Sequence, residues 1–225
     1  MKPLILALAL LLAVPAGPEP PHPKPPKPHP VKDLRELAHQ NGINIGTAVD
    51  IAALRDEPDY RKRLNREFTQ VTAENAMKWE SVEPERGVYT WDDADALVEN
   101  AGRNHQQIRG HTLLWHNQLP AWLTSGVEDG TIDAAELREI LREHITTQVR
   151  RYKGKIRAWD VVNEVVEEDG SLRQSIWLEH LGPGYIADAF RWAHRADPHA
   201  KLFINDYNLE WNAPRSRPRC PSSRT

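Results

Sequence analysis

The sequence predicts an α/β fold in which helices cover a parallel β-sheet. From residue 32 onward, short strand-like segments alternate with segments of helical periodicity, the pattern of repeated βα units. Polar residues follow the ends of several candidate strands, and the phosphate-binding loops GxGxxG and GxxxxGKS do not occur in the sequence. The chain of 225 residues is long enough to fold around one sizeable hydrophobic core.

The first 31 residues are predicted to lie outside this domain. Residues 1–16 resemble a signal peptide, with Lys2 before the apolar run LILALALLLAV and a suitable cleavage point after Ala16. The run is short for a membrane span, so we expect a secreted protein without membrane contact after cleavage; an uncleaved anchor is the alternative. Residues 17–31 are proline-rich and are predicted to form an extended linker.

Five helix-and-strand pairs are predicted in chain order. Gly42 ends the first helix, since glycine is favoured just past the C-terminal end of a helix. Pro58 begins the second, since proline is favoured at the first helical position. The predicted bounds are helix 34–42 and strand 43–49, helix 58–68 and strand 70–75, helix 93–104 and strand 107–116, a helix from Asp133 to about Val149 and strand 155–164, and helix 184–196 and strand 200–206.

The helix that follows Asp133 has the clearest signal. Asp133 and Glu136 have the spacing of a capping box, which favours a helix start at this point. Apolar residues then recur at the i, i+3, i+4 spacing of a helix with one buried face. They are Leu137, Ile140, Leu141, Ile145 and Val149.

Polar residues gather at the ends of four candidate strands. Such groups at the carboxyl ends of several strands are typical of the active site of a (β/α)8 barrel, whereas a flat doubly wound sheet gathers them at one switch point. The pattern therefore favours a barrel. The residues are Glu74, Asn75 and Lys78; His111, Trp115, His116, Asn117 and Gln118; Asn163 and Glu164; and Asn205, Asp206, Tyr207 and Asn208.

The run RAWDVVNE places Glu164 directly after an apolar strand, where an unpaired carboxylate is costly to desolvate. Glycosidic cleavage uses such a group as an acid, together with a second carboxylate and a hydrogen bond to the sugar 2-OH that Asn163 can supply. Helix capping by Glu164 is the simpler alternative. His111 and His116 could be core residues or metal ligands, but the HExxH zinc pattern is not present.

Four segments carry a specific resemblance. VTAENAMKWE, RGHTLLWHNQLPAW, WDVVNE and FINDYNLE, in this order, resemble glycoside hydrolase family 10, whose typical member is a secreted endo-1,4-β-xylanase. The resemblance spans about residues 34–212 and implies a (β/α)8 TIM barrel that retains anomeric configuration. It implies xylan or xylo-oligosaccharide as the partner, with no cofactor and no obligate protein partner. The net charge of -3 gives no reason to expect nucleic acid.

The resemblance also implies a role for each matching residue. Glu164 corresponds to the general acid/base, and Asn163 to the residue that binds the 2-OH. His111 and Trp115 would surround the cleaved sugar, and Tyr207 would stack on the aglycone side. The residues implied to line the glycone subsites are Glu74, Asn75, Lys78 and Gln118.

The sequence departs from the family pattern near its C-terminus. The family nucleophile is a Glu after the seventh strand, usually preceded by Thr, and this sequence contains no Thr-Glu dipeptide. We therefore expect an incomplete TIM barrel of about five of eight βα units, over residues 32–212. Residues 213–225, an Arg/Pro/Ser-rich tail, are expected to be unstructured.

Three functions remain open at this point. The first is a xylanase truncated before its nucleophile, which would be inactive alone and poorly soluble because its sheet edges stay open. The second is a non-catalytic xylan-binding protein, which must stay folded and retain xylo-oligosaccharide. The third, an unrelated activity on an open doubly wound sheet, would need a cofactor loop that the sequence does not contain.

Overall fold

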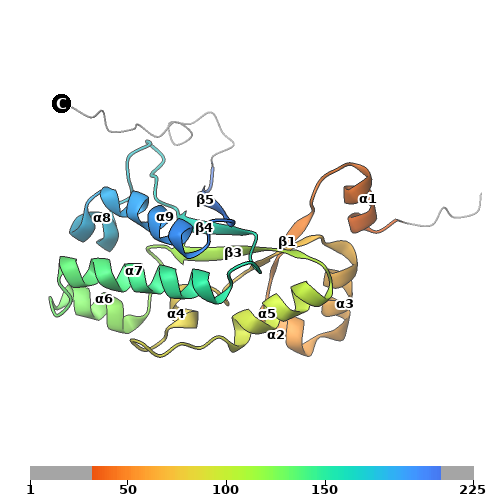
Figure 1. Cartoon of the computed structure of the whole chain (residues 1–225), viewed down its shortest axis with the longest axis horizontal. Helices are drawn as coiled ribbons and strands as arrows, with labels where there is room; N and C mark the ends of the chain where they lie inside the picture. The colour runs from red at the N-terminus through yellow and green to blue at the C-terminus, as the bar shows by residue number, and fades with distance from the viewer. Residues whose placement is uncertain (1–31, 209–225) are drawn as a thin grey trace, which may run out of the picture. The chain divides into compact units, whose positions relative to one another are not determined.

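The computed structural model describes residues 32–208. The predicted signal peptide, the linker and the Arg/Pro/Ser-rich tail lie outside the described residues, as do positions 209–212. The described residues contain one parallel sheet whose strands lie side by side in chain order, which confirms the predicted α/β class (Figure 1). The strands are β1 (Gly46–Val49), β2 (Gln70–Ala73), β3 (Gln107–Leu114), β4 (Ala158–Asn163) and β5 (Lys201–Asn205).

All five predicted helices form. Four shorter helices also form that the sequence did not predict, because a helix of one or two turns shows too little periodicity to be recognised. The predicted helices are α1 (Leu34–Gln40), α3 (Pro58–Glu67), α5 (Asp92–Arg103), α7 (Ala134–Arg151) and α9 (Gly184–Ala196). The missed helices are α2 (Ile51–Asp56), α4 (Trp79–Val82), α6 (Ala121–Glu128) and α8 (Ile176–Leu181).

The start of α7 confirms half of the predicted capping box. The Asp133 carboxylate accepts a hydrogen bond from the Glu136 backbone N–H at 2.8 Å, as an N-cap residue should. The Glu136 side chain pairs instead with Arg86, at 2.6 Å. The five apolar residues predicted to line one face of this helix are all buried, so the helix is held mainly by its packing.

The sheet has one face covered by helices. Helix α5 packs on β2 and β3, α7 packs on β3, and α9 packs on β4 and β5. Trp159 of β4 is fully buried, and its indole lies against Gly110 of β3, its partner in the register. A Cβ at Gly110 would lie 2.2 Å from that indole, so only glycine allows the strand and the ring to approach so closely.

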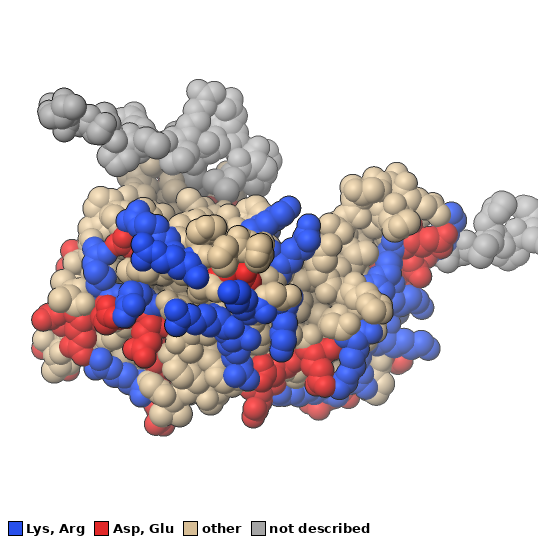
Figure 2. All heavy atoms as spheres, in the orientation of Figure 1, with Lys and Arg blue, Asp and Glu red and all other residues tan. Residues whose placement is uncertain are grey.

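The outer surface of the helices carries charges of both signs. Figure 2 shows Lys and Arg interspersed with Asp and Glu on this face. Two ion pairs join neighbouring helices: Arg138 of α7 pairs with Asp188 of α9, and Arg151 of α7 pairs with Asp95 of α5. Partly exposed pairs of this kind contribute little to stability, so the buried core accounts for most of it.

The opposite face of the sheet is polar and open. Arg109, His111, Asp160 and Asn205 line a space of about 590 Å³ together with residues of β1 and β2. In a closed barrel this face would be the interior. Among residues 32–208, β1 and β5 are the edge strands and have no neighbour on their outer side.

Candidate active site

Glu164 lies at the point where β4 ends, directly after Asn163. Its backbone has a φ of 53°, in the left-handed region that a non-glycine residue adopts at a cost. Two hydrogen bonds hold this turn: the Glu164 N–H donates to the Asn205 carbonyl at 2.8 Å, and Arg173 donates to the Glu164 carbonyl at 2.8 Å. The backbone is thus fixed by β5 on one side and by the following loop on the other.

The Glu164 carboxylate is bonded to Trp115, which follows β3. The Trp115 indole N–H donates to Glu164 Oε2 at 3.0 Å. The two residues line one small hollow with His116, Asn163 and Arg173. One carboxylate oxygen is therefore held by the indole, which sets the direction of the other.

Lys78 joins the ends of β2 and β3. Its ammonium donates to Asn75 Oδ1 at 2.9 Å and to Gln118 Oε1 at 2.5 Å, and it lies 4.9 Å from the centroid of the Trp115 ring. The Gln118 amide in turn donates to Glu80 at 2.8 Å. This Lys78 cluster, made of Asn75, Lys78, Glu80 and Gln118, presents several polar groups at one end of the sheet.

Burial and nearby carboxylates act on Lys78 in opposite directions. Burial lowers the pKa of Lys78, while the negative charges of Glu74, Glu80 and Glu164 raise it, and burial is the stronger effect. The lysine therefore lies within the electrostatic field of Glu164 as well as of Glu74.

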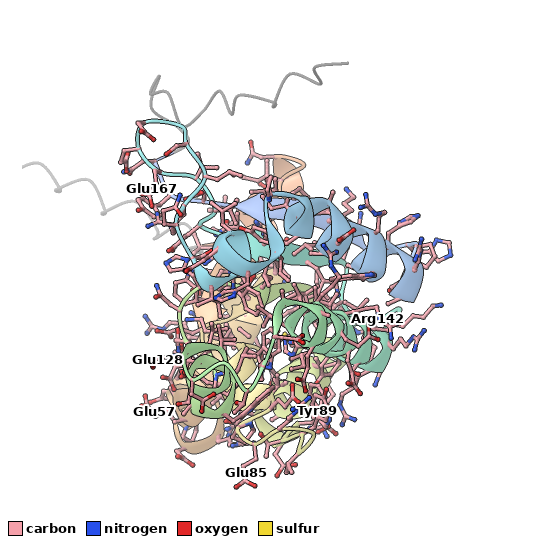
Figure 3. The ribbon with its side chains drawn as sticks, turned by 90° about the vertical axis from the view of Figure 1, so that its left-hand side faces the viewer. Glu57, Glu85, Tyr89, Glu128, Arg142 and Glu167 are labelled. Carbon is pink, nitrogen blue, oxygen red and sulfur yellow. The ribbon has the colours of Figure 1, made fainter. Side chains whose placement is uncertain are left out.

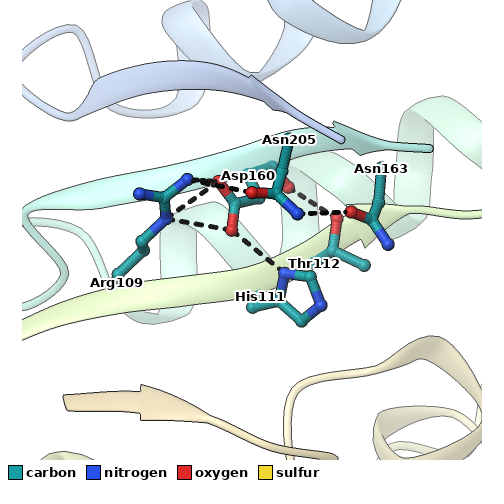
Figure 4. Close-up of polar contacts among 6 residues, drawn as sticks. All are labelled: Arg109, His111, Thr112, Asp160, Asn163 and Asn205. Carbon is teal, nitrogen blue, oxygen red and sulfur yellow. Dashed lines mark hydrogen bonds and ion pairs between the residues drawn. The ribbon is translucent and has the colours of Figure 1, made fainter. Parts of the chain in front are cut away.

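A second network lies below the site, on the inner face of β3 and β4 (Figure 4). Asp160, only 2% exposed, accepts hydrogen bonds from the Arg109 guanidinium at 2.5 and 3.0 Å and contacts His111 Nδ1 at 3.0 Å. Because the Asp160 carboxylate is an acceptor, His111 carries its proton on Nδ1 and leaves Nε2 for another partner. The Asn205 amide donates to Asn163 Oδ1 at 2.8 Å, which orients the Asn163 side chain.

Arg173 connects the loop after β4 to the residues after β5. It donates to the Tyr207 hydroxyl at 2.9 Å and pairs with Glu167 at 3.3 Å. Figure 3 shows Glu167 on this loop, at the opposite end of the view from Glu85. Burial and the Arg173 charge lower the pKa of His116 against the opposing effect of nearby carboxylates, so His116 is neutral at pH 7.

The predicted site residues fall into three groups. Asn75, Lys78, Gln118, Trp115 and Glu164 form one set of contacts. His111 and Asn163 are each held by another side chain, Asp160 and Asn205 respectively, and Tyr207 is reached through Arg173. Glu74 shares the open inner space with His111 and acts on Lys78 through its charge.

Two arginines at the site were missed from the sequence. Arg109 stands inside a strand, two residues before His111, and this inward charge within an apolar stretch is a signal that the sequence does contain. Arg173 lies on a loop nine residues beyond Glu164, and the sequence gives no sign of its contact. Asp160 bonds to both Arg109 and His111 and so orients those two side chains.

The described residues show no sign of a metal site or of a membrane-spanning helix. Between positions 32 and 208, His, Cys, Asp and Glu side chains form no group of three or more that could hold a metal ion. Within the same range, no helix is both long and apolar enough to cross a membrane.

A parallel sheet with a carboxylate, an amide and an aromatic donor at its carboxyl end is the arrangement of a barrel glycoside hydrolase. The model of the family Glycosyl hydrolase family 10 matches residues 33–219. The chain therefore belongs to glycoside hydrolase family 10. This match continues past residue 212, the limit expected from the sequence.

Curated and solved relatives agree with this assignment. Endo-1,4-beta-xylanase 3 of Hypocrea jecorina is 50% identical over 180 residues, which cover 80% of this chain and 50% of that protein. Xylanase 10B of Thermotoga petrophila RKU-1, solved in complex with xylobiose, is 44% identical with a TM-score of 0.77, and the match covers 82% of this chain and 56% of that one. The chain thus spans about half the length of the curated relatives it matches.

Proposed function

We propose that this protein carries the acid/base part of a retaining endo-1,4-β-xylanase site. The observation that carries the proposal is the position of Glu164, fixed at the end of β4 by the Trp115 indole and flanked by Asn163. The relatives support xylan as the substrate class, since one is named as an endo-1,4-beta-xylanase and another was solved with xylobiose bound.

Each residue then has a defined task. Glu164 donates its proton to the oxygen of the β-1,4-xylosidic bond as that bond breaks, and the Asn163 amide binds the 2-OH of the sugar that becomes the cation. The Lys78 cluster binds hydroxyls of the glycone sugars, because its ammonium and amides are donors and acceptors at fixed positions. His111 offers Nε2 to the same sugar, held in place by Asp160.

We further propose that the nucleophile comes from outside residues 32–208. A retaining pair of carboxyl groups lies about 5 Å apart across the sugar. Two carboxylates close to Glu164 in the fold, one in β4 and one after β5, have structural partners: Asp160 binds Arg109, and Asp206 accepts the backbone N–H of Val166. The chain by itself is therefore expected to cleave xylan extremely slowly.

An external nucleophile tests this division of roles. The chain is incubated with an aryl β-xylobioside that has a poor leaving group, with and without sodium azide. Azide should take the place of the carboxylate that residues 32–208 do not supply and release the phenol with formation of α-xylobiosyl azide, and Glu164→Gln should abolish that release because the acid is lost. Rapid hydrolysis without azide, or equal azide rescue in Glu164→Gln, would contradict the proposal.

A non-catalytic xylan-binding protein is the second candidate. The Lys78 cluster favours it, since these contacts are complete among the described residues and do not depend on a nucleophile. This candidate predicts tight retention of xylo-oligosaccharide with no product under either azide condition.

Secretion is proposed from the sequence. If residues 1–16 are a signal peptide, expression in a secreting host should release a protein whose first residue is Gly17, as mass spectrometry of the medium can show. Retention of Met1 in a membrane fraction would support the uncleaved anchor.

A further inference from the structure

A buried aromatic stack lies behind the acid. His144 of α7 stacks on Trp79 of α4, with ring centroids 3.7 Å apart and an interplanar angle of 7°. Trp177 of α8 stacks on the same tryptophan at 5.7 Å and 10°. All three side chains are buried, with at most 3% of each residue exposed, so their rings have little freedom to turn.

The stack is connected to the site at two points. The Trp177 indole N–H donates to the backbone carbonyl of Trp115 at 2.9 Å. Trp79, the central ring, directly follows Lys78, whose ammonium lies over the Trp115 ring. Lys78 and Trp115 are therefore linked in two ways. The ammonium contacts the Trp115 ring directly, and the chain from Lys78 to Trp79 leads through the Trp177 ring to the Trp115 carbonyl.

These contacts reach the proposed acid/base, because the Trp115 indole N–H donates to Glu164 Oε2. The Trp177 hydrogen bond holds the backbone from which the Trp115 side chain extends, and the Lys78 ammonium over the ring favours the indole orientation that donates to Glu164. Burial lowers the pKa of His144 and keeps its ring neutral, so the outer member of the stack packs as an uncharged aromatic ring.

We propose that Trp177 is a positioning residue for the acid/base: its indole N–H, held in place by the rings of Trp79 and His144, fixes Trp115 and thereby the orientation of Glu164. The inference deepens the proposed function and rests on it for the role of Glu164. The contact that it concerns, from Trp115 to Glu164, can be measured without any sugar.

The test is hydrogen exchange of the Trp115 indole N–H, followed by NMR on the full chain. Trp177→Phe keeps an aromatic ring in the stack and removes the donor to Trp115 together with part of the buried indole. The Trp115 N–H should then exchange about fivefold faster, the factor that loss of one ordinary hydrogen bond represents. Trp192→Phe, a matched change at a half-buried tryptophan of α9, should leave the rate unchanged.

Two further measurements make the result decisive. Glu164→Ala removes the acceptor and gives the exchange rate of a released Trp115 N–H for comparison. An unchanged Trp115 rate in folded Trp177→Phe would overturn the inference. If Trp177→Phe does not fold, the unmodified chain provides the test. Its Trp177 indole N–H must exchange as slowly as its Trp115 indole N–H, and fast exchange at Trp177 would overturn the inference.

A xylotriose titration of the same NMR samples separates this inference from the proposed function. Absence of xylotriose binding by the unmodified chain counts against the proposed function and leaves the indole measurement intact. If the unmodified chain binds xylotriose but the Trp115 indole N–H exchanges at the same rate in it and in Trp177→Phe, the result counts against the positioning role alone.

Discussion

The centre and the edge of the sheet differ in burial, although both contribute to the site. In β4 every residue after Ala158 is buried, whereas β5 has no buried residue and exposes 40% of Phe203 and 49% of Ile204. Yet Asn205 of β5 supplies the carbonyl that fixes Glu164 and the amide that orients Asn163. The site therefore depends on a rigid strand and on an exposed one.

The largest expected effect is at the centre. Trp159→Ala removes a fully buried indole from β4 and should lower the free energy of unfolding by about 3–5 kcal/mol. Ile204→Ala on β5 is the matched edge substitution and should cost less than about 1 kcal/mol, because half of its side chain is already in water. Urea unfolding of the two variants measures the contrast; equal losses would mean that the two strands do not differ as described.

The second-largest loss of stability is expected at Asp160, the buried carboxylate beneath the site. Asp160→Asn leaves the Arg109 guanidinium without its charged partner and should cost about 3 kcal/mol. It also replaces one carboxylate oxygen by an NH2 donor, so Arg109 and His111 must share a single acceptor and the His111 ring resonances should change. Asp93→Asn, which breaks an exposed pair with Arg55, is the control and should cost less than about 0.5 kcal/mol by urea unfolding.

Two glycines give a smaller but sharper contrast. Gly110→Ala places a Cβ 2.2 Å from the Trp159 ring and should destabilise the protein by about 1–3 kcal/mol. Gly102→Ala lies in α5, where a Cβ meets nothing within 4 Å, and should leave stability unchanged or raise it by up to about 1 kcal/mol. A thermal melt distinguishes them, and a stable Gly110→Ala would show that the strands at the centre can separate.

The pH dependence is the smallest effect. Burial lowers the pKa of His144 in the folded state and outweighs the opposing effect of the nearby Glu83 carboxylate, so the unfolded chain binds more protons below the ordinary value of 6.5. The contribution of His144 to stability is thus complete above pH 6.5 and declines as the pH falls below it. His144→Phe keeps the stack and should flatten the stability curve below pH 6.5, while the exposed His194→Phe should not; identical curves would contradict this assignment.

The sequence predicted the sheet better than the site. Long amphipathic helices such as α7 and the apolar strand β4 have periodicities that fix their type, and all five predicted strands form. The predicted bounds were less accurate: strand 43–49 was predicted to begin before Gly46, and the other four predicted strands run past the observed ends, since the polar residues after β2 and β3 belong to turns. Expectations of poor solubility and of a truncated enzyme remain predictions.

The contacts inside the site were not predictable from spacing. The motifs indicated that Trp115, Lys78 and Glu164 belong together, but not that the indole would hold the carboxylate. Arg173 reaches Tyr207 from a separate loop, a contact that depends on the tertiary fold. The stack of His144, Trp79 and Trp177 joins helices α4, α7 and α8, two of which were too short to recognise in the sequence.

The most direct measurement is a calorimetric titration of xylotriose into the full chain, repeated with Lys78→Met. If the site binds xylo-oligosaccharide, the unmodified chain should show one binding event. Loss of the Lys78 ammonium should weaken that event at least about tenfold, because charged hydrogen bonds to sugar hydroxyls are lost. No binding by the unmodified chain, or equal affinity in Lys78→Met, would contradict the account.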